Sequence, residues 1–178
     1  EIINNTKPNG HAVLNADDTF FKLHKKLALK KNLKIISFGI KNPKSNIKLV
    51  NLIKKGKSQT INVKINQIKK LFLISNNFKN NVYNILAALA VISVNEDISK
   101  LSKKFFLDFK TPVGRGDFSK VKIDKKYINL IDESYNSNPL SLKSAIQNFD
   151  KFQANESKKY LLLGDMLELG IHSKKLHQ

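Results

Sequence analysis

The sequence predicts an α/β protein built from two parts. Short apolar segments alternate with helical patterns, and after residue 112 the order strand, loop, helix, strand, loop, helix is the rhythm of a parallel sheet. With 178 residues, 41% of them hydrophobic, the chain can bury a core. It contains no Cys, and its longest apolar run is about half of a membrane span. The sequence therefore predicts neither a disulfide framework nor a spanning helix.

The first part predicts a mixed sheet with helices, because alternating segments around Gly56 indicate a β-hairpin. The expected elements are a strand at 12–14, a helix at 20–33, a strand at 34–38, hairpin strands at 47–53 and 61–65, and helices at 81–94 and 98–106. Residues 111–116 interrupt regular structure. The expected elements after them are a strand at 127–131, a helix at 139–149, a strand at 160–163 and a final helix. This change of character predicts a domain boundary near residue 112.

The chain carries a net charge of +18, which suits a nucleic-acid partner. The composition weakens that hypothesis. Lys, Asn and Ile occupy 71 of 178 positions and share A/T-rich codons, and the 31 Lys are scattered along the chain. A basic nucleic-acid-binding module therefore stays the weaker alternative to a solvated, lysine-rich surface.

Arg115 is the single arginine, which suggests that lysine cannot replace it. Its planar fork of donors fits phosphate or carboxylate oxygens, and Gly114 and Gly116 let the backbone bend and a ligand approach. We take Arg115 as the candidate catalytic residue. The alternative is an arginine that pairs with a surface carboxylate between domains.

Two polar loops follow expected strands, where ligands gather in α/β sheets. The first holds Asp132, Glu133, Asn136 and Asn138, with Asn138 placed to cap a helix that begins at Pro139. The second holds Asp165 and Glu168. Carboxylates at such places can accept hydrogen bonds from ribose hydroxyls. The alternatives are a polar loop with a good cap and acids that only cap the next helix.

Asn81 and Asn84 lie three residues apart at the start of an expected helix, so they share a face. Their amides could hydrogen-bond the edge of an adenine ring, the alternative being caps or solvated side chains. The four His lack zinc-binding spacing, and no Gly-rich phosphate-binding loop that ends in Lys-Ser/Thr occurs. The residues alone support an α/β protein with a polyanion-facing arginine at a domain junction.

The motifs together resemble the Mur ligase family. In chain order they are AVLNADD at 12–18, NNVYNILAA at 80–88, PVGRG at 112–116, DESYNSNP at 132–139 and GDMLELG at 164–170. The resemblance implies that residues 1–112 are the later part of a central ATP-binding domain. Residues 113–178 would then begin a Rossmann-like C-terminal domain.

The resemblance also implies roles for the candidate residues. Asn81 and Asn84 would contact adenine, and Arg115 would bind the γ-phosphate from the domain junction. Asp132 or Glu133 would hold the ribose; many family members have Asp where Glu133 stands. Asp165 and Glu168, with Asn136 and Asn138, would lie near the incoming substrate. For Asn15, Asp17 and Asp18 we expect structural support.

The implied reaction is ATP-driven amide formation in peptidoglycan precursor synthesis. The last two motifs indicate the family member that adds D-alanyl-D-alanine to UDP-N-acetylmuramoyl-tripeptide. The substrate carboxylate attacks the γ-phosphate to give an acyl phosphate, and the dipeptide amine then displaces phosphate. Another Mur-type ligase with a different acceptor is the alternative. A cytoplasmic monomer that uses ATP and Mg²⁺, without nucleic acid or membrane insertion, is expected.

The chain begins at Glu1 and its only Met is Met166, so we expect an internal piece of a longer protein. The family's phosphate loop and Mg²⁺ ligands would precede Glu1. We therefore expect the 178-residue chain by itself to be inactive.

Overall fold

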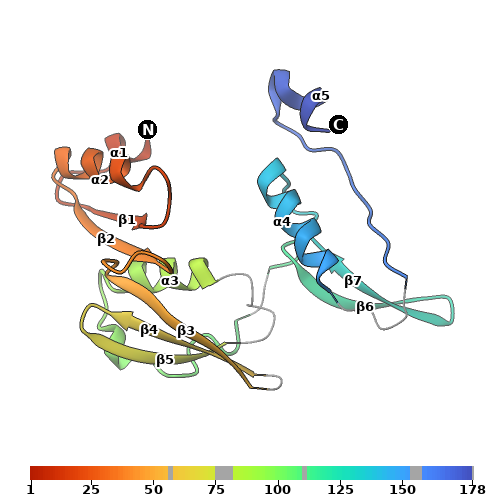
Figure 1. The fold of residues 1–178 in the computed structure, drawn as a ribbon, viewed down its shortest axis with the longest axis horizontal. Helices are drawn as coiled ribbons and strands as arrows, with labels where there is room; N and C mark the ends of the chain where they lie inside the picture. The colour runs from red at the N-terminus through yellow and green to blue at the C-terminus, as the bar shows by residue number, and fades with distance from the viewer. Residues whose placement is uncertain (56–57, 75–81, 110–111, 153–157, 178) are drawn as a thin grey trace. The chain divides into compact units, whose positions relative to one another are not determined.

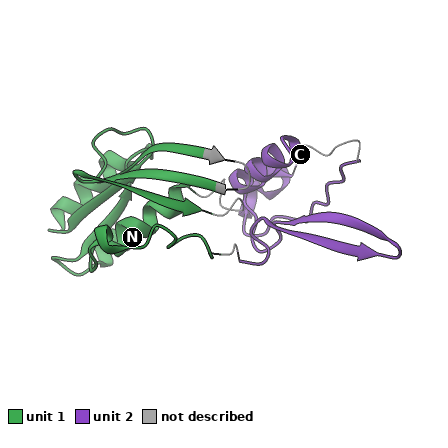
Figure 2. Ribbon diagram, turned by 90° about the horizontal axis from the view of Figure 1, so that it is seen from below, with its two compact units in different colours: residues 1–110 green, residues 111–178 purple. Residues whose placement is uncertain are grey.

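The computed structural model describes residues 1–55, 58–74, 82–109, 112–152 and 158–177. It divides into two compact units, Glu1–Lys110 and Thr111–Gln178 (Figure 2). The division lies beside residue 112, where the sequence changes character. The assignment of the two parts to an ATP-binding domain and a C-terminal domain stays a prediction.

Unit 1 is built on a five-stranded mixed sheet (Figure 1). In spatial order its strands are β1 (His11–Asn15), β2 (Lys34–Gly39), β3 (Ile47–Lys55), β4 (Ser58–Ile65) and β5 (Ile68–Ile74). The first three strands are parallel, and the last three form an antiparallel meander. The predicted strands and the hairpin are confirmed. Strand β5 was not predicted.

Two helices cover opposite faces of this sheet. Residues Ala12 and Leu14 pack with α2 (Phe21–Lys30), whereas Val13 between them packs in the cluster that contains α3 (Val82–Ile92). Successive strand residues point to opposite faces, which is why one short strand serves both helices. The cluster with α3 is the main core, and its fully buried side chains include Phe72, Leu86 and Leu89. A short helix, α1 (Ile2–Asn5), precedes β1 and packs on α2.

The predicted helix at 98–106 is wrong. Only Ile98–Lys100 is helical, as a single 3-10 turn that the Asp97 side chain caps by accepting from the Ser99 N–H at 2.9 Å. The chain then runs along β5: the Leu73 N–H donates to the Lys103 carbonyl at 2.9 Å. Phe106 packs edge-on against Phe72, with ring centroids 5.4 Å apart. Tertiary pairing with the sheet thus replaces the local helical preference.

Unit 2 contains an antiparallel hairpin and helices (Figure 1). Its elements are β6 (Asp117–Ile123), β7 (Lys126–Asp132), α4 (Pro139–Asp150), a 3-10 turn at Gly170–His172 and α5 (Ser173–Leu176). The strand predicted at 127–131 and the helix predicted at 139–149 are confirmed. The parallel strand–helix–strand arrangement is wrong for the described residues, because β7 pairs with β6 in antiparallel register.

The strand predicted at 160–163 is also wrong. These apolar residues form no regular strand, and Leu162 is 99% exposed. An extended apolar segment becomes a strand only when a neighbour completes its hydrogen-bond ladder. Within the part of unit 2 that the structure describes, β6 and β7 pair only with each other, and residues 160–163 have no ladder partner.

Candidate functional site

Two predicted motifs meet in unit 2. The loop 112–116 leads into β6 and the loop 132–138 follows β7, and the first residue of β6, Asp117, is paired in register with the last of β7, Asp132. The Gly116 N–H donates to the Asp132 carbonyl at 2.7 Å, and the Tyr135 N–H donates to the Gly114 carbonyl at 3.0 Å. The hairpin therefore brings together the arginine loop and the carboxylate loop. Together they are called the loop pair below.

Both glycines of the arginine loop are required by the close approach of the second loop. Gly114 has φ +75° and Gly116 has φ +83°, in the region that favours glycine. A Cβ on Gly114 would lie 2.9 Å from the Tyr135 amide nitrogen, and one on Gly116 would lie 2.9 Å from Oε1 of Glu133. The sequence predicts glycines that bend the backbone and admit a ligand. The structure shows that they admit the neighbouring loop.

Arg115 is exposed at the tip of its loop, and its Cζ lies 4.2 Å from the centroid of the Tyr135 ring. That distance is within the range of a cation–π contact. Within the described residues of unit 2, the guanidinium is thus paired with an aromatic face, and its functional role stays a prediction. No role was predicted for Tyr135, although it lies inside the motif at 132–139.

Three carboxylates lie in or next to the loop pair. Oδ1 of Asp117 accepts the Gly114 N–H at 2.8 Å, a contact that sequence analysis did not anticipate. Hydrogen bonds from Ser134, including its N–H at 2.9 Å, lower the pKa of Asp132. Burial, and then the charges of Asp117 and Asp132, raise the pKa of Glu133. The surroundings therefore favour the charged form of Asp132 and disfavour the charged form of Glu133.

Asn138 caps α4, as its position before Pro139 predicts. Its Oδ1 accepts from Leu140 N–H at 3.0 Å and from Ser141 N–H at 2.9 Å, and its own N–H donates to the Ser141 hydroxyl at 3.0 Å. This reciprocal capping box fixes the end of the carboxylate loop. Asn136, two residues earlier, is exposed.

Asp165 and Glu168 are exposed in a segment outside regular structure, where Glu168 has φ +62°. Between them Met166 is buried, and its N–H donates to Nε2 of His177 at 2.9 Å. Within the described residues of unit 2, no hydrogen bond joins this segment to the loop pair. Their predicted proximity to the substrate stays a prediction.

In unit 1, Asn84 lies on the exposed side of α3, and Asn81 lies outside the described residues. The shared face predicted for the pair stays a prediction. The Asn15–Asp18 turn has the structural role that we expected: Asn15 Oδ1 accepts the Asp17 N–H at 3.0 Å. The hydroxyl of Tyr83, next to Asn84, donates to Asp17.

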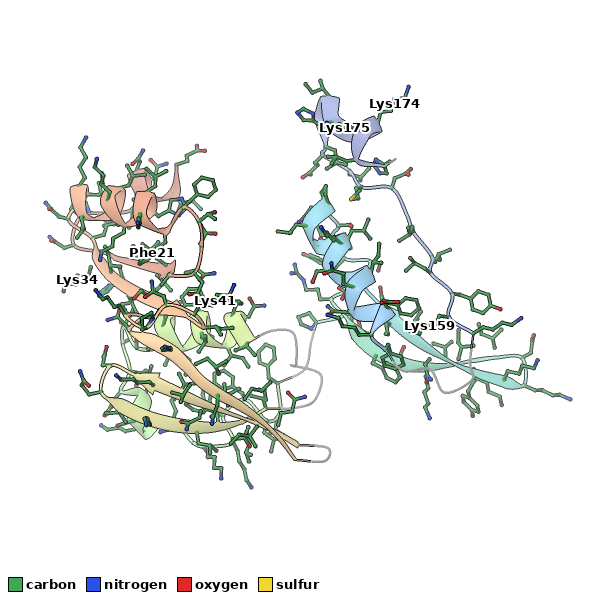
Figure 3. All side chains as sticks on the ribbon, viewed as in Figure 1. Phe21, Lys34, Lys41, Lys159, Lys174 and Lys175 are labelled. Atoms are coloured by element: carbon green, nitrogen blue, oxygen red, sulfur yellow. The ribbon has the colours of Figure 1, made fainter. Side chains whose placement is uncertain are left out.

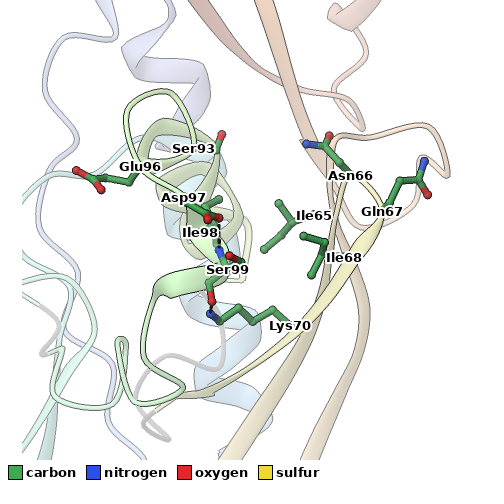
Figure 4. A pocket seen from close by; sticks show the side chains of 10 residues that line it. All are labelled: Ile65, Asn66, Gln67, Ile68, Lys70, Ser93, Glu96, Asp97, Ile98 and Ser99. Carbon is green, nitrogen blue, oxygen red and sulfur yellow. Dashed lines mark hydrogen bonds between the residues drawn. The ribbon is translucent and has the colours of Figure 1, made fainter.

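A cavity of about 280 Å³ opens beside the β4–β5 turn of unit 1 (Figure 4). Ile65, Ile68 and Ile98 give it an apolar wall, and the Lys70 ammonium at its rim donates to the Ser99 carbonyl. None of the candidate site residues that the structure describes lines it.

Basic side chains are spread over both units rather than gathered in one stripe; the lysines labelled in Figure 3 belong to both units. One of them, Lys159, donates to the carbonyls of Phe149 and Asp150 at the end of α4. In the described part of the chain, no group of three His, Asp or Glu side chains is arranged to hold a metal ion. No described helix is long and apolar enough to cross a membrane.

Named relatives are similar along the whole chain. UDP-N-acetylmuramoyl-tripeptide–D-alanyl-D-alanine ligases from Rickettsia prowazekii and Buchnera aphidicola are 31% and 34% identical over 186 residues. Each alignment covers 100% of this chain and 38% of the relative. The chain thus spans well under half of the length of these relatives.

Solved structures share the fold. MurF from Acinetobacter baumannii matches with a TM-score of 0.76 at 22% identity, over 99% of this chain and 36% of that one. The MurF ligase of Thermotoga maritima, solved in complex with ADP, matches with a TM-score of 0.73 at 24% identity, over 99% of this chain and 38% of that one. The predicted α/β class is confirmed. A family model described as the Mur ligase middle domain matches residues 1–92, which is more than half of the sequence, and the chain therefore belongs to the Mur ligase family.

Proposed function

We propose that the protein to which this chain belongs is an ATP-dependent ligase that joins D-alanyl-D-alanine to UDP-N-acetylmuramoyl-tripeptide. The similarity of the whole chain to relatives with that name supports the acceptor and the substrate. The single observation that carries the nucleotide role is the loop pair, which presents the one arginine of the sequence on a glycine-bounded turn beside the carboxylate loop.

Arg115 would bind the terminal phosphate of ATP. Its guanidinium is exposed, and its planar donors can meet two phosphate oxygens at once. Because negative charge shifts among those oxygens during phosphoryl transfer, a positioned cation lowers the barrier. When bound, ATP supplies the phosphoryl group that activates the substrate carboxylate toward the dipeptide amine.

The carboxylate loop would hold the sugar of the nucleotide. Asp132 carries the stronger assignment because hydrogen bonds from Ser134 favour its charged, accepting form, whereas burial and neighbouring charges disfavour ionisation of Glu133. Glu133 packs against Gly116 and supports the arginine loop instead. Asn81 and Asn84 would contact the adenine edge.

The remaining candidates would contact the incoming dipeptide. Asp165 and Glu168 would attract its ammonium group, and Asn136 would bind its peptide or carboxylate oxygens. Asn138 would offer its Nδ2 amide, since the cap uses only its Oδ1. The described residues provide no metal-binding cluster, so a required Mg²⁺ would take its ligands from elsewhere in the complete protein.

We further propose that residues 1–112 belong to the ATP-binding domain and residues 113–178 to the C-terminal domain of a cytoplasmic, monomeric enzyme. Nucleic acid is not proposed as a partner, since the basic side chains are dispersed. Binding to duplex DNA that weakens steeply with salt would reverse this conclusion.

The test uses the complete protein and measures formation of the amide product together with ADP. Arg115→Ala should lower turnover at least a hundredfold, in the range seen when one transition-state donor is removed. Arg115→Lys should restore little, because a single ammonium cannot make the bidentate contact. Near-normal turnover of the lysine variant would contradict the role given to the guanidinium. Comparing D-alanyl-D-alanine with single amino acids as acceptors separates this ligase from other Mur-type ligases.

A further inference from the structure

The contact between Arg115 and Tyr135 has a geometry that leaves the arginine available. The guanidinium carbon lies 4.2 Å from the ring centroid, so the aromatic face, and not a hydrogen-bond acceptor, is the partner. When a guanidinium stacks on a ring it uses its face, and its five N–H donors then remain free in its own plane. A carboxylate partner would occupy those same donors. The ring therefore restrains the side chain without consuming what a phosphate needs.

The ring is itself held in place by the loop pair. The Tyr135 backbone N–H donates to the Gly114 carbonyl at 3.0 Å, one residue before the arginine. A Cβ on Gly114 would come within 3.0 Å of the tyrosine Cβ, so the two backbones are as close as glycine allows. Tyr135 is 66% exposed and is not part of a hydrophobic core, so core packing does not account for an aromatic residue at this position.

We propose that Tyr135 is the positioning residue of Arg115: its ring orders the guanidinium so that the N–H edge faces an incoming phosphate. This inference rests on the proposed role of Arg115 in binding ATP. A free arginine side chain has several rotatable bonds and loses that freedom when it binds a ligand. A ring that restrains it beforehand reduces this loss, and only an aromatic face does so without competing for donors.

The first experiment compares variants of the complete protein by kcat and KM for ATP. Tyr135→Leu should lower kcat/KM for ATP about two- to fivefold, the range of an exposed cation–π contact. Tyr135→Phe keeps the ring and should stay near wild type. Tyr127→Leu is the matched control, since Tyr127 is equally exposed, at 70%, on the hairpin of the same unit. In the Arg115→Ala background, Tyr135→Leu should have no further effect.

The second experiment observes the contact directly. In the ¹⁵N-labelled complete protein, the Arg115 Nε–Hε resonance is identified by its absence from the Arg115→Ala spectrum. A ring above the guanidinium shifts this proton upfield in wild type and Tyr135→Phe, and the shift should disappear in Tyr135→Leu. An unchanged resonance in Tyr135→Leu overturns the contact itself.

The outcomes separate the two proposals. If Tyr135→Leu lowers activity equally in the wild-type and Arg115→Ala backgrounds, Tyr135 has a structural role, and the positioning role is overturned. Activity of Tyr135→Phe as low as that of Tyr135→Leu assigns the function to the hydroxyl and also overturns it. If Arg115→Ala itself keeps full turnover, the proposed phosphate contact fails first, even where the resonance shift proves the stack.

Discussion

The hydroxyl of Tyr83 donates to Oδ2 of Asp17 at 3.0 Å, which joins α3 to the turn after β1 across 66 residues of sequence. The same carboxylate accepts three backbone N–H groups from the loop after β2, those of Ile40, Lys41 and Asn42, at 2.5, 2.9 and 2.7 Å. The Asp17 side chain thus connects the ends of β1 and β2 to α3, the helix that carries Asn84.

We expect Asp17→Asn to lower the free energy of unfolding by about 1–3 kcal/mol, because the amide cannot accept four hydrogen bonds and one amide hydrogen would face backbone donors. Tyr83→Phe should cost about 1 kcal/mol, and the double variant less than the sum, since both changes remove one shared contact. Urea unfolding measures these values. Asp18→Asn is the control: Asp18 is exposed and, among the described residues, its side chain accepts from the Phe20 N–H alone. Additive losses would show that the two side chains act independently.

Stability should also depend on the titration of Asp17. Burial raises the pKa of this carboxyl, but the hydrogen bonds from Lys41, Ile40, Asn42 and Tyr83 outweigh it, so the folded-state pKa is below 3.8. Its contribution is therefore complete above the unfolded value of 3.8 and is lost as the pH falls through the lower folded value. Asp17→Asn should flatten the acid limb of a plot of unfolding free energy against pH. An unchanged acid limb would contradict the assignment.

The titration of Glu133 should change stability with pH in the direction opposite to that of Asp17. Burial and the charges of Asp117 and Asp132 raise its pKa above 4.5, so folding favours its protonated form. Its contribution to stability is present below the unfolded value and is lost as the pH rises through the folded value. We therefore expect Glu133→Gln to stabilise the chain at pH 7 more than at pH 4, as measured by urea unfolding at both values. Equal effects at both values would show that the local charges do not oppose ionisation.

Gly114→Ala should separate the loop pair. The positive φ costs a side chain about 1–2 kcal/mol, and the added Cβ would meet the Tyr135 amide nitrogen at 2.9 Å. Amide hydrogen exchange of Gly116 and Tyr135 should accelerate, since their N–H groups make the bonds between the loops. Gly164→Ala is the matched control, because a Cβ there meets nothing within 4 Å. Unchanged exchange at both amides in Gly114→Ala would mean that the loops tolerate the methyl group.

Asn138 allows its two roles to be separated. Asn138→Ala removes the capping box and should cost about 1 kcal/mol, seen as faster amide exchange in the first turn of α4. Asn138→Asp keeps the accepting oxygen and should preserve the helix, but it replaces the Nδ2 donor. In the complete protein we expect this variant to raise KM for D-alanyl-D-alanine without changing KM for ATP. Wild-type kinetics would limit Asn138 to its cap.

Local chemistry explains which predictions succeeded. The alternating hairpin of unit 1 and the cap at Asn138 depend on neighbours in sequence, so both were predictable. The meeting of Arg115 with Tyr135 was not, because it requires β6 to pair with β7, and no strand was predicted at 117–123.

The failures have the same origin. Residues 98–106 have helical spacing, but in the folded chain Phe106 packs against Phe72 of the sheet instead of joining a helix. Residues 160–163 have the composition of a strand, but a strand also needs a partner. Sequence patterns report the preference of a segment, and only tertiary pairing decides whether that preference is realised.

Because Arg115 is the single arginine of the sequence, cleavage after arginine can be used to follow this one turn. A protease that cuts only after arginine has a single target in these 178 residues, the bond between Arg115 and Gly116, and would release fragments 1–115 and 116–178. That bond lies in the turn whose side chain rests on Tyr135. The rate of one cleavage, read from two bands on a gel, therefore measures how tightly this turn is closed and which added nucleotides shield it.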